Sequence, residues 1–151
     1  MGHHIRAIIG KIDNIQKFAD NDCVCAKVIG LPQNMGMVML TEKLFEELEE
    51  RSVEMSRGDP CSELDGFDGT AAGILERYSL NTKLAYIETD YFGGAGTQGG
   101  VLYSDGRETI SARVGEGTVN LLLRELGVCV LSPDMDEFDC LGLGQYRYMD
   151  E

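Results

Sequence analysis

Residues that could do chemistry gather around a glycine-rich segment in the second half of the chain. Glu88 and Tyr91 precede Gly-Gly-Ala-Gly-Thr-Gln-Gly-Gly at positions 93–100, and Gln98 lies within it. A carboxylate beside a phenol and an amide could serve as the base of a small hydrolase or transferase if the three side chains met in a pocket. The alternative is a structural carboxylate that accepts hydrogen bonds from loop amides or from an arginine, so Glu88 is only a weak catalytic candidate.

The glycine-rich segment itself could bind a ligand. A phosphate-binding loop needs a following helix and usually a nearby lysine. Here the residues that follow are Val-Leu-Tyr-Ser, which are typical of a strand. The five glycines between positions 93 and 100 therefore favour a structural bend or bulge, and a binding loop is the alternative. A binding loop would use Tyr91, Phe92, Gly94 and Gln98.

A second polar group lies near the C-terminal end, where four acids surround Phe138. They could bind a cation, but an exposed helix end is the commoner structure. Phe138, Leu141 and Leu143 are apolar enough to predict that this segment docks next to residues 93–99, with Tyr91 or Phe92 at the contact. The four acids are Asp134, Asp136, Glu137 and Asp139. The candidate binding residues of this segment are Asp136, Glu137 and Arg147. We expect Arg147 to pair with a carboxylate.

Imidazole and thiol chemistry have little support. His3 and His4 are the two histidines of the chain, and we interpret them as a frayed terminus or the remnant of an expression tag. Neighbouring residues of a strand point to opposite faces, so the pair does not form a metal site. A Cys–His or Ser–His–Asp enzyme is therefore disfavoured. We expect no metal and no cofactor, and free thiols in a reducing cytoplasm at Cys23, Cys25, Cys61, Cys129 and Cys140.

The amino-acid composition limits the kinds of partner that the chain can bind. The 151 residues carry 26 acidic and 13 basic side chains, for a formal net charge of −13. Such a charge repels nucleic acid and anionic membranes and favours a basic protein partner. No apolar run approaches the roughly 20 residues of a membrane span, and no secretory leader pattern is present. We therefore predict a cytoplasmic protein, and the sequence does not indicate its oligomeric state.

The helices and strands expected from the sequence must position these residues, and their order predicts one α+β domain over residues 1–151. Most links between strands are too short for helical crossovers, so the sheet should be largely antiparallel, with about five to six strands packed against three to four helices. Asp105-Gly106 predicts a type I′ turn between the last two strands of a meander. The strands are expected at 3–9, 24–31, 35–40, 83–92, 101–104, 107–114 and 128–131, the helices at 11–20, 41–55, 71–78 and 118–126, a helical turn after Ser132-Pro133, and an extended piece at 145–148.

Two segments resemble those of a family of small, functionally uncharacterised bacterial proteins. Tyr86-Ile-Glu-Thr-Asp-Tyr-Phe-Gly-Gly-Ala-Gly-Thr-Gln98 is similar to its signature segment, and Asp136-Glu-Phe-Asp-Cys-Leu-Gly-Leu-Gly144 to a second motif. Residues 31–40 and the helix that ends at Leu126-Gly127 resemble other parts of these proteins. Where an aromatic residue would be expected, positions 22–25 read Asp-Cys-Val-Cys, which affects only local packing. The resemblance implies no activity.

Together these patterns favour a small, acidic bacterial protein-binding module, comparable with immunity or accessory proteins by analogy of type. The alternative is a small hydrolase or transferase with a carboxylate site beside the glycine-rich bend.

Overall fold

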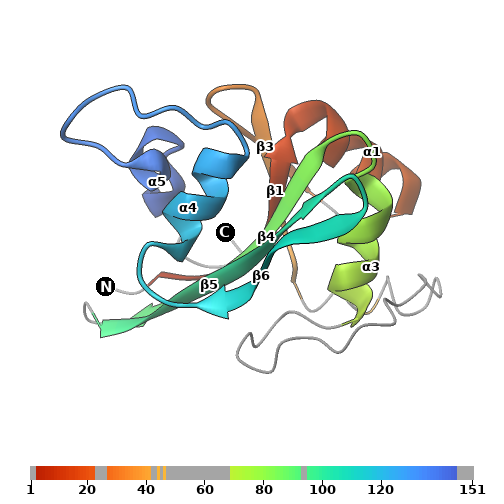
Figure 1. Cartoon of the computed structure of the whole chain (residues 1–151), viewed down its shortest axis with the longest axis horizontal. Helices are drawn as coiled ribbons and strands as arrows, with labels where there is room; N and C mark the ends of the chain where they lie inside the picture. Colours follow the sequence, from red (N-terminus) through yellow and green to blue (C-terminus); the bar gives the residue numbers. More distant parts are fainter. Residues whose placement is uncertain are drawn as a thin grey trace.

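The core of the molecule is one antiparallel sheet of six strands. The computed structural model describes residues 3–22, 27–41, 44, 46, 69–92 and 95–145 (Figure 1). The strand order is β2-β3-β1-β4-β5-β6, and every neighbouring pair is antiparallel. The strands are β1 (His3–Lys11), β2 (Val28–Leu31), β3 (Met35–Met39), β4 (Lys83–Phe92), β5 (Ala95–Ser104) and β6 (Arg107–Val114).

Helices cover both faces of this sheet, as Figure 1 shows. On one face lie α1 (Ile12–Asp22) and α3 (Gly69–Tyr78), and on the other lie α4 (Thr118–Glu125), α5 (Glu137–Cys140) and the 3₁₀ turn η1 (Leu143–Gln145). The α+β class and the largely antiparallel sheet predicted from the sequence are thereby confirmed.

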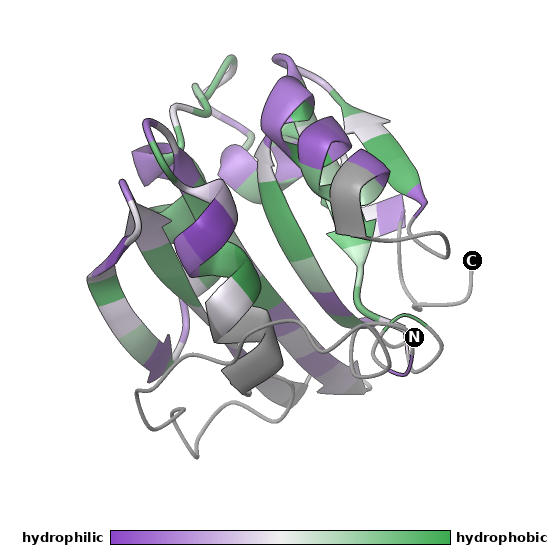
Figure 2. Cartoon of the chain, turned by 90° about the vertical axis from the view of Figure 1, so that its right-hand side faces the viewer, coloured by the Kyte–Doolittle hydropathy of each residue, from purple (hydrophilic) through white to green (hydrophobic). Residues whose placement is uncertain are grey.

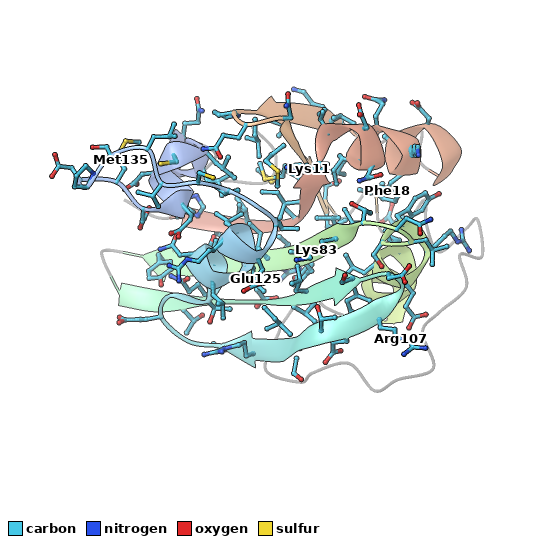
Figure 3. All side chains as sticks on the ribbon, turned by 45° about the horizontal axis from the view of Figure 1, so that its top comes forward. Lys11, Phe18, Lys83, Arg107, Glu125 and Met135 are labelled. Atoms are coloured by element: carbon cyan, nitrogen blue, oxygen red, sulfur yellow. The ribbon has the colours of Figure 1, made fainter. Side chains whose placement is uncertain are left out.

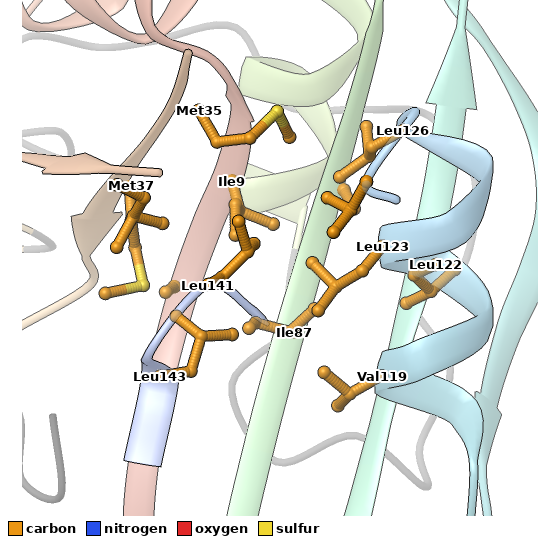
Figure 4. Close-up of a cluster of buried hydrophobic side chains, with 14 of the residues drawn as sticks. Ile9, Met35, Met37, Ile87, Val119, Leu122, Leu123, Leu126, Leu141 and Leu143 are labelled. Carbon is orange, nitrogen blue, oxygen red and sulfur yellow. The ribbon is translucent and has the colours of Figure 1, made fainter. Parts of the chain in front are cut away.

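Two hydrophobic clusters fill the spaces between the layers. Along β4, Leu84 and Tyr86 face the cluster under α1 and α3, whereas Ala85 and Ile87 face the cluster under α4. Both sets are buried, so the part of the strand from Leu84 to Ile87 is apolar on both faces rather than alternating. Figure 2 shows hydrophobic residues concentrated along the central strands, with hydrophilic residues on the outer sides of the helices. Figure 4 shows the second cluster in detail.

The tight turn expected at Asp105-Gly106 is present. The backbone φ angles of these residues are 52° and 80°, as a type I′ turn requires. Thr41 also behaves as the predicted N-cap, because its hydroxyl accepts the N–H of Leu44 at 3.2 Å. The rest of the helix expected over 41–55 lies outside the described residues.

The strand predicted at 128–131 is wrong. Helix α4 ends in a Schellman motif, in which Gly127 has φ 101° and the N–H of Val128 bonds to the carbonyl of Leu123. The next residue, Cys129, is then held by a side chain instead of a neighbouring strand. Gln33 accepts its N–H at 2.8 Å and donates to its carbonyl at 3.0 Å. These two bonds satisfy the backbone that a strand ladder would otherwise use.

The helical turn expected at Ser132-Pro133 begins later than predicted. Residues 132–135 form a reverse turn closed by a 3.1 Å hydrogen bond from the N–H of Met135 to the carbonyl of Ser132. Helix α5 starts at Glu137, and its N-cap is Asp136. Asp136 and Asp139 make a reciprocal capping box, a stronger start signal than a lone serine because two backbone N–H groups are satisfied.

Candidate functional site

A cavity of about 270 Å³ opens where β4 and β5 meet α4 and α5. Its lining combines polar and aromatic side chains from both segments that the sequence singled out. The two segments therefore line one cavity, as predicted, but Phe138 contacts His3 of β1 and Asn120 of α4, so a direct contact of the C-terminal segment with Tyr91 stays a prediction. The lining residues are His3, Thr89, Tyr91, Gln98, Val119, Asn120, Asp136 and Phe138.

Gln98 connects three elements at this cavity. Its Nε2 donates to the Tyr91 hydroxyl at 2.9 Å, and its Oε1 accepts the N–H of Val119 at 2.9 Å. The second bond caps α4, whose own N-cap residue, Gly117, offers no side-chain hydrogen bond. The Tyr91 oxygen accepts the bond from Gln98 and, like any phenol oxygen, can accept a second one.

Replacing Gln98 with alanine should lower the free energy of unfolding by about 1–2 kcal/mol, because one helix cap and one further hydrogen bond are lost together. Gln16→Ala is the matched control, since Gln16 is exposed and donates to the exposed Asp20 one turn away at 2.9 Å. Urea unfolding followed by circular dichroism measures both. Equal midpoints for the two variants would show that the Gln98 cap contributes nothing.

Asn120 links α4 to the start of α5. Its Nδ2 donates to Asp136 Oδ2 at 3.0 Å, and its Oδ1 accepts the N–H of Phe138 at 2.9 Å. The other oxygen of Asp136 accepts the N–H of Asp139 at 2.8 Å. Burial acts to raise the pKa of Asp136, but the hydrogen bonds from Asp139 and Asn120 outweigh it and lower that pKa. The carboxylate is therefore ionised at neutral pH.

Glu137 does not line the cavity. Its side chain is 6% exposed and accepts a 2.8 Å bond from Arg124 Nε, which docks α5 on α4. Of the other three acids near Phe138, Asp136 and Asp139 also have hydrogen-bond partners, because they form the capping box of α5. Within the described ranges, no group of three histidine, cysteine or acidic side chains is arranged to hold a metal ion.

The interpretation of His3 and His4 as a frayed terminus is wrong, because both pair in β1, His3 opposite Tyr91 and His4 opposite Asp90. His3 Nε2 lies 3.0 Å from the carbonyl oxygen of Leu143, which can only accept, so Nε2 carries the proton. His4 points to the other face, 3.5 Å from an Asp90 oxygen.

His3 also contacts two other residues of the cavity. Its Nδ1 lies 2.7 Å from the Thr89 hydroxyl, and its ring meets that of Phe138 edge-on at 5.3 Å between centroids. In the neutral Nε2–H form, Nδ1 accepts the hydroxyl proton of Thr89. That hydroxyl in turn accepts the N–H of Ile5 at 3.2 Å, and the residue Thr89 is 4% exposed. It therefore holds the strands and the ring in place and is not presented as a nucleophile.

Glu88 is separated from the other catalytic candidates. It faces the α1 and α3 side of the sheet with Tyr86, whose hydroxyl donates to Glu88 Oε1 at 2.7 Å. Tyr91 is an odd number of positions away and so points to the opposite face. Gln98 pairs with Thr89 and shares the face of Tyr91. The three side chains expected to form a catalytic site do not converge.

Other predicted positions are only partly described. The β4–β5 ladder continues to the pair Phe92–Ala95, which makes the glycine-rich segment a hairpin. The Phe92 side chain, Gly94 and Arg147 lie outside the described residues. So do Cys23, Cys25 and Cys61, whereas Cys129 is an exposed and Cys140 a buried free thiol.

Sequence reasoning missed four of the lining residues. One signal could have placed His3: it stands at every second position with the apolar residues Ile5, Ala7 and Ile9, so it shares their face of the strand, the face that α4 covers. Nothing local marks the other three, because the strand register and the docking of α4 bring them together. They are Thr89, Val119 and Asn120.

No family model, curated protein or solved structure matches the chain. Within the described part of the chain, no helix has the length and apolar character needed to cross a membrane. Function is therefore inferred from the cavity and from the surface around it.

Proposed function

We propose that the chain is a small cytoplasmic protein-binding module, of the immunity or accessory type, whose partner is a basic protein. The observation that carries the proposal is an exposed apolar loop that leads directly into the acid-containing cavity. A net charge of −13 would steer a basic partner toward this surface and make association sensitive to salt. We also propose that the chain belongs with the small bacterial proteins that it resembles, on the likeness of the segments 86–98 and 136–144.

Residues 129–135, here called the 129–135 loop, expose large apolar side chains. Val130 is 46%, Leu131 74% and Met135 40% exposed. Met135 projects outward at the edge of the molecule in Figure 3. Apolar side chains gathered on one short loop are typical of a contact surface for another protein.

The 129–135 loop is held in place at both ends. Its first residue, Cys129, makes the two backbone hydrogen bonds to Gln33, and the N–H of Leu131 lies 3.5 Å from Cys140 Sγ. After the reverse turn, the chain passes into the Asp136 cap of α5. A loop fixed in this way loses little conformational entropy on binding, so more of the contact energy contributes to affinity.

An enzyme based on Glu88 has less support. Glu88 lies across the sheet from the cavity, and both ring nitrogens of His3 are engaged in hydrogen bonds. The remaining acid of the cavity, Asp136, caps a helix and bonds to Asn120. These groups are committed to structure, which suits a binding surface better than proton transfer.

The proposal predicts a partner that depends on the 129–135 loop. The native chain and a Val130→Ser/Leu131→Ser variant are used as baits in extract of the native organism at low salt. Any captured protein is identified, purified and titrated by calorimetry. The double variant should bind at least about tenfold more weakly, because two exposed apolar contacts are lost. Raising the salt concentration should also weaken binding by the native chain.

The matched control is Leu80→Ser. Leu80 is 59% exposed but follows α3, which covers the opposite face of the sheet from α4 and α5. It should leave affinity unchanged. Failure to recover a protein partner at low salt would remove the proposal, and equal weakening by both variants would show that the assigned surface is wrong.

A further inference from the structure

We infer that the cavity binds the guanidinium group of an arginine side chain that the basic partner inserts between β4 and α5. This inference deepens the proposed function and rests on it, because it names the chemistry by which the partner is recognised. It is carried by three properties of the cavity: its charge, its aromatic lining and its size.

The charge of the cavity favours a cation. Asp136 is the one acid among the lining residues, and no described lysine or arginine pairs with it. Each of its oxygens accepts one hydrogen bond, and a carboxylate oxygen can accept two, so both retain capacity toward a ligand. Both ring nitrogens of His3 are engaged, one with the carbonyl of Leu143 and the other with the Thr89 hydroxyl.

The N-terminal end of α4, which reaches the cavity at Val119, would by itself favour an anion. Its first two donors are already used, however. The N–H of Thr118 bonds to the carbonyl of Gly115 at 3.3 Å, and that of Val119 bonds to Gln98. The carboxylate of Asp136 in the same lining would repel an anion, so the local charge favours a cation.

The aromatic lining selects among cations. The rings of His3, Tyr91 and Phe138 all border the cavity, together with the apolar Val119. A guanidinium group is planar, weakly hydrated and able to stack on rings while it donates to a carboxylate. Its methylene stem can pack against the apolar lining, as long basic side chains commonly do.

The size of the cavity suits a side chain better than a whole small molecule. Its volume of about 270 Å³ is below the range of roughly 300–1,000 Å³ that is usual for sites of drug-sized ligands. The lining is also fixed before binding, because Gln98 is tied to Tyr91 and Val119, and Asn120 to Asp136. Little further ordering is then needed.

The test uses a matched pair of probes on the full chain. n-Propylguanidinium and n-propylurea have nearly the same shape, but only the first is charged. Titration is followed by the NMR signals of the Val119 and Phe138 amides and of the Gln98 and Asn120 side-chain amides. The guanidinium should shift these signals with a dissociation constant on the order of 1 mM, as expected for a ligand of so few atoms, and the urea should not.

Two variants localise the charge. Asp136→Asn should weaken guanidinium binding at least about tenfold, because a charge-assisted hydrogen bond is lost. Asp13→Asn removes the same charge from an exposed position of α1, on the other face of the sheet, and should leave binding unchanged. The comparison of the two probes uses the native chain alone. It therefore tests whether the cavity prefers the charged probe even if Asp136→Asn disturbs α5.

Equal shifts with both probes, no shifts with either, or undiminished binding by a folded Asp136→Asn variant would overturn the inference. A partner that is captured but not displaced by n-propylguanidinium would also overturn it, while leaving the proposed function intact. If the probe binds as expected but no partner is captured, cation binding by the cavity stands and the proposed function fails.

Discussion

Gly100→Ala should lower the free energy of unfolding by about 3 kcal/mol or more, at the upper end of the usual cost of overpacking. A methyl group at this position would lie 2.5 Å from Leu122 Cδ1 and would also collide with the carbonyl oxygen of Tyr86. Leu122 can shift, but Tyr86 belongs to the backbone of β4, which is paired with β5 along its length. Neither strand can move away without loss of ladder hydrogen bonds.

Gly30→Ala is the matched control for this substitution. Gly30 also lies in a strand, β2, but nothing stands within 4 Å of the position that its Cβ would take. Its stability should be unchanged or raised by up to about 0.5 kcal/mol, because alanine reduces the entropy of the unfolded chain. Urea unfolding of both variants gives the comparison, and a Gly100→Ala midpoint equal to the native one would mean that α4 does not pack tightly on β5.

Gly100 explains why the glycine-rich segment could be read only in part from the sequence. The glycines predicted a bend over 93–100 with the second strand beginning at Val101, but the β4–β5 ladder already includes Ala95, so that boundary is wrong and Gly96, Gly99 and Gly100 lie within β5. What the sequence does not show is which neighbour each glycine accommodates. A Cβ at Gly96 would collide with the Asp90 and Tyr91 backbone, and one at Gly100 with Leu122 of α4. These contacts depend on strand register and helix docking, which are set by distant parts of the chain.

The strongest local signals were read correctly. Asp105-Gly106 demanded a type I′ turn whatever surrounded it, because both residues tolerate positive φ. The end of α4 at Gly127 follows from the same property. The stretch 128–131 misled because its apolar residues match a buried strand. Its structure is decided instead by Gln33, almost a hundred positions earlier in the chain, and no local pattern reports such a partner.

The candidate site was predicted at the level of segments and not of side chains. Tyr91, Gln98 and Asp136 line the same cavity, and Gln98 contacts Tyr91 directly. Glu88 was grouped with Tyr91 because the two are close in sequence, although strand alternation alone places them on opposite faces. The face of Gln98 depended on the hairpin register, which pairs it with Thr89 and could not be fixed before the structure.

The C-terminal segment owes its position to buried leucines more than to its aromatic residue. Leu141 and Leu143 are 0% exposed, whereas Phe138 is only partly buried. Leu141 belongs to the cluster that includes Ile9 of β1 and Ile87 of β4, as Figure 4 shows. Leu141 should therefore contribute most to holding α5, and with it Asp136 and the wall of the cavity.

Leu141→Ala should accordingly cost about 2–5 kcal/mol, the range found when a fully buried leucine is truncated and a cavity remains. Leu131→Ala removes the same atoms from a side chain that is 74% exposed, and it should change stability by no more than about 0.5 kcal/mol. Urea unfolding measures both variants.

Because α5 carries the Asp136 cap and the N–H of Phe138 that bonds to Asn120, Leu141→Ala should also broaden or shift the amide signals of Phe138 and Asn120, whereas Leu131→Ala should not. A Leu141→Ala variant of native stability would mean that hydrogen bonds alone anchor α5. The cavity would then depend on the contacts that Asn120 makes with Asp136 and Phe138 rather than on the hydrophobic cluster beneath them.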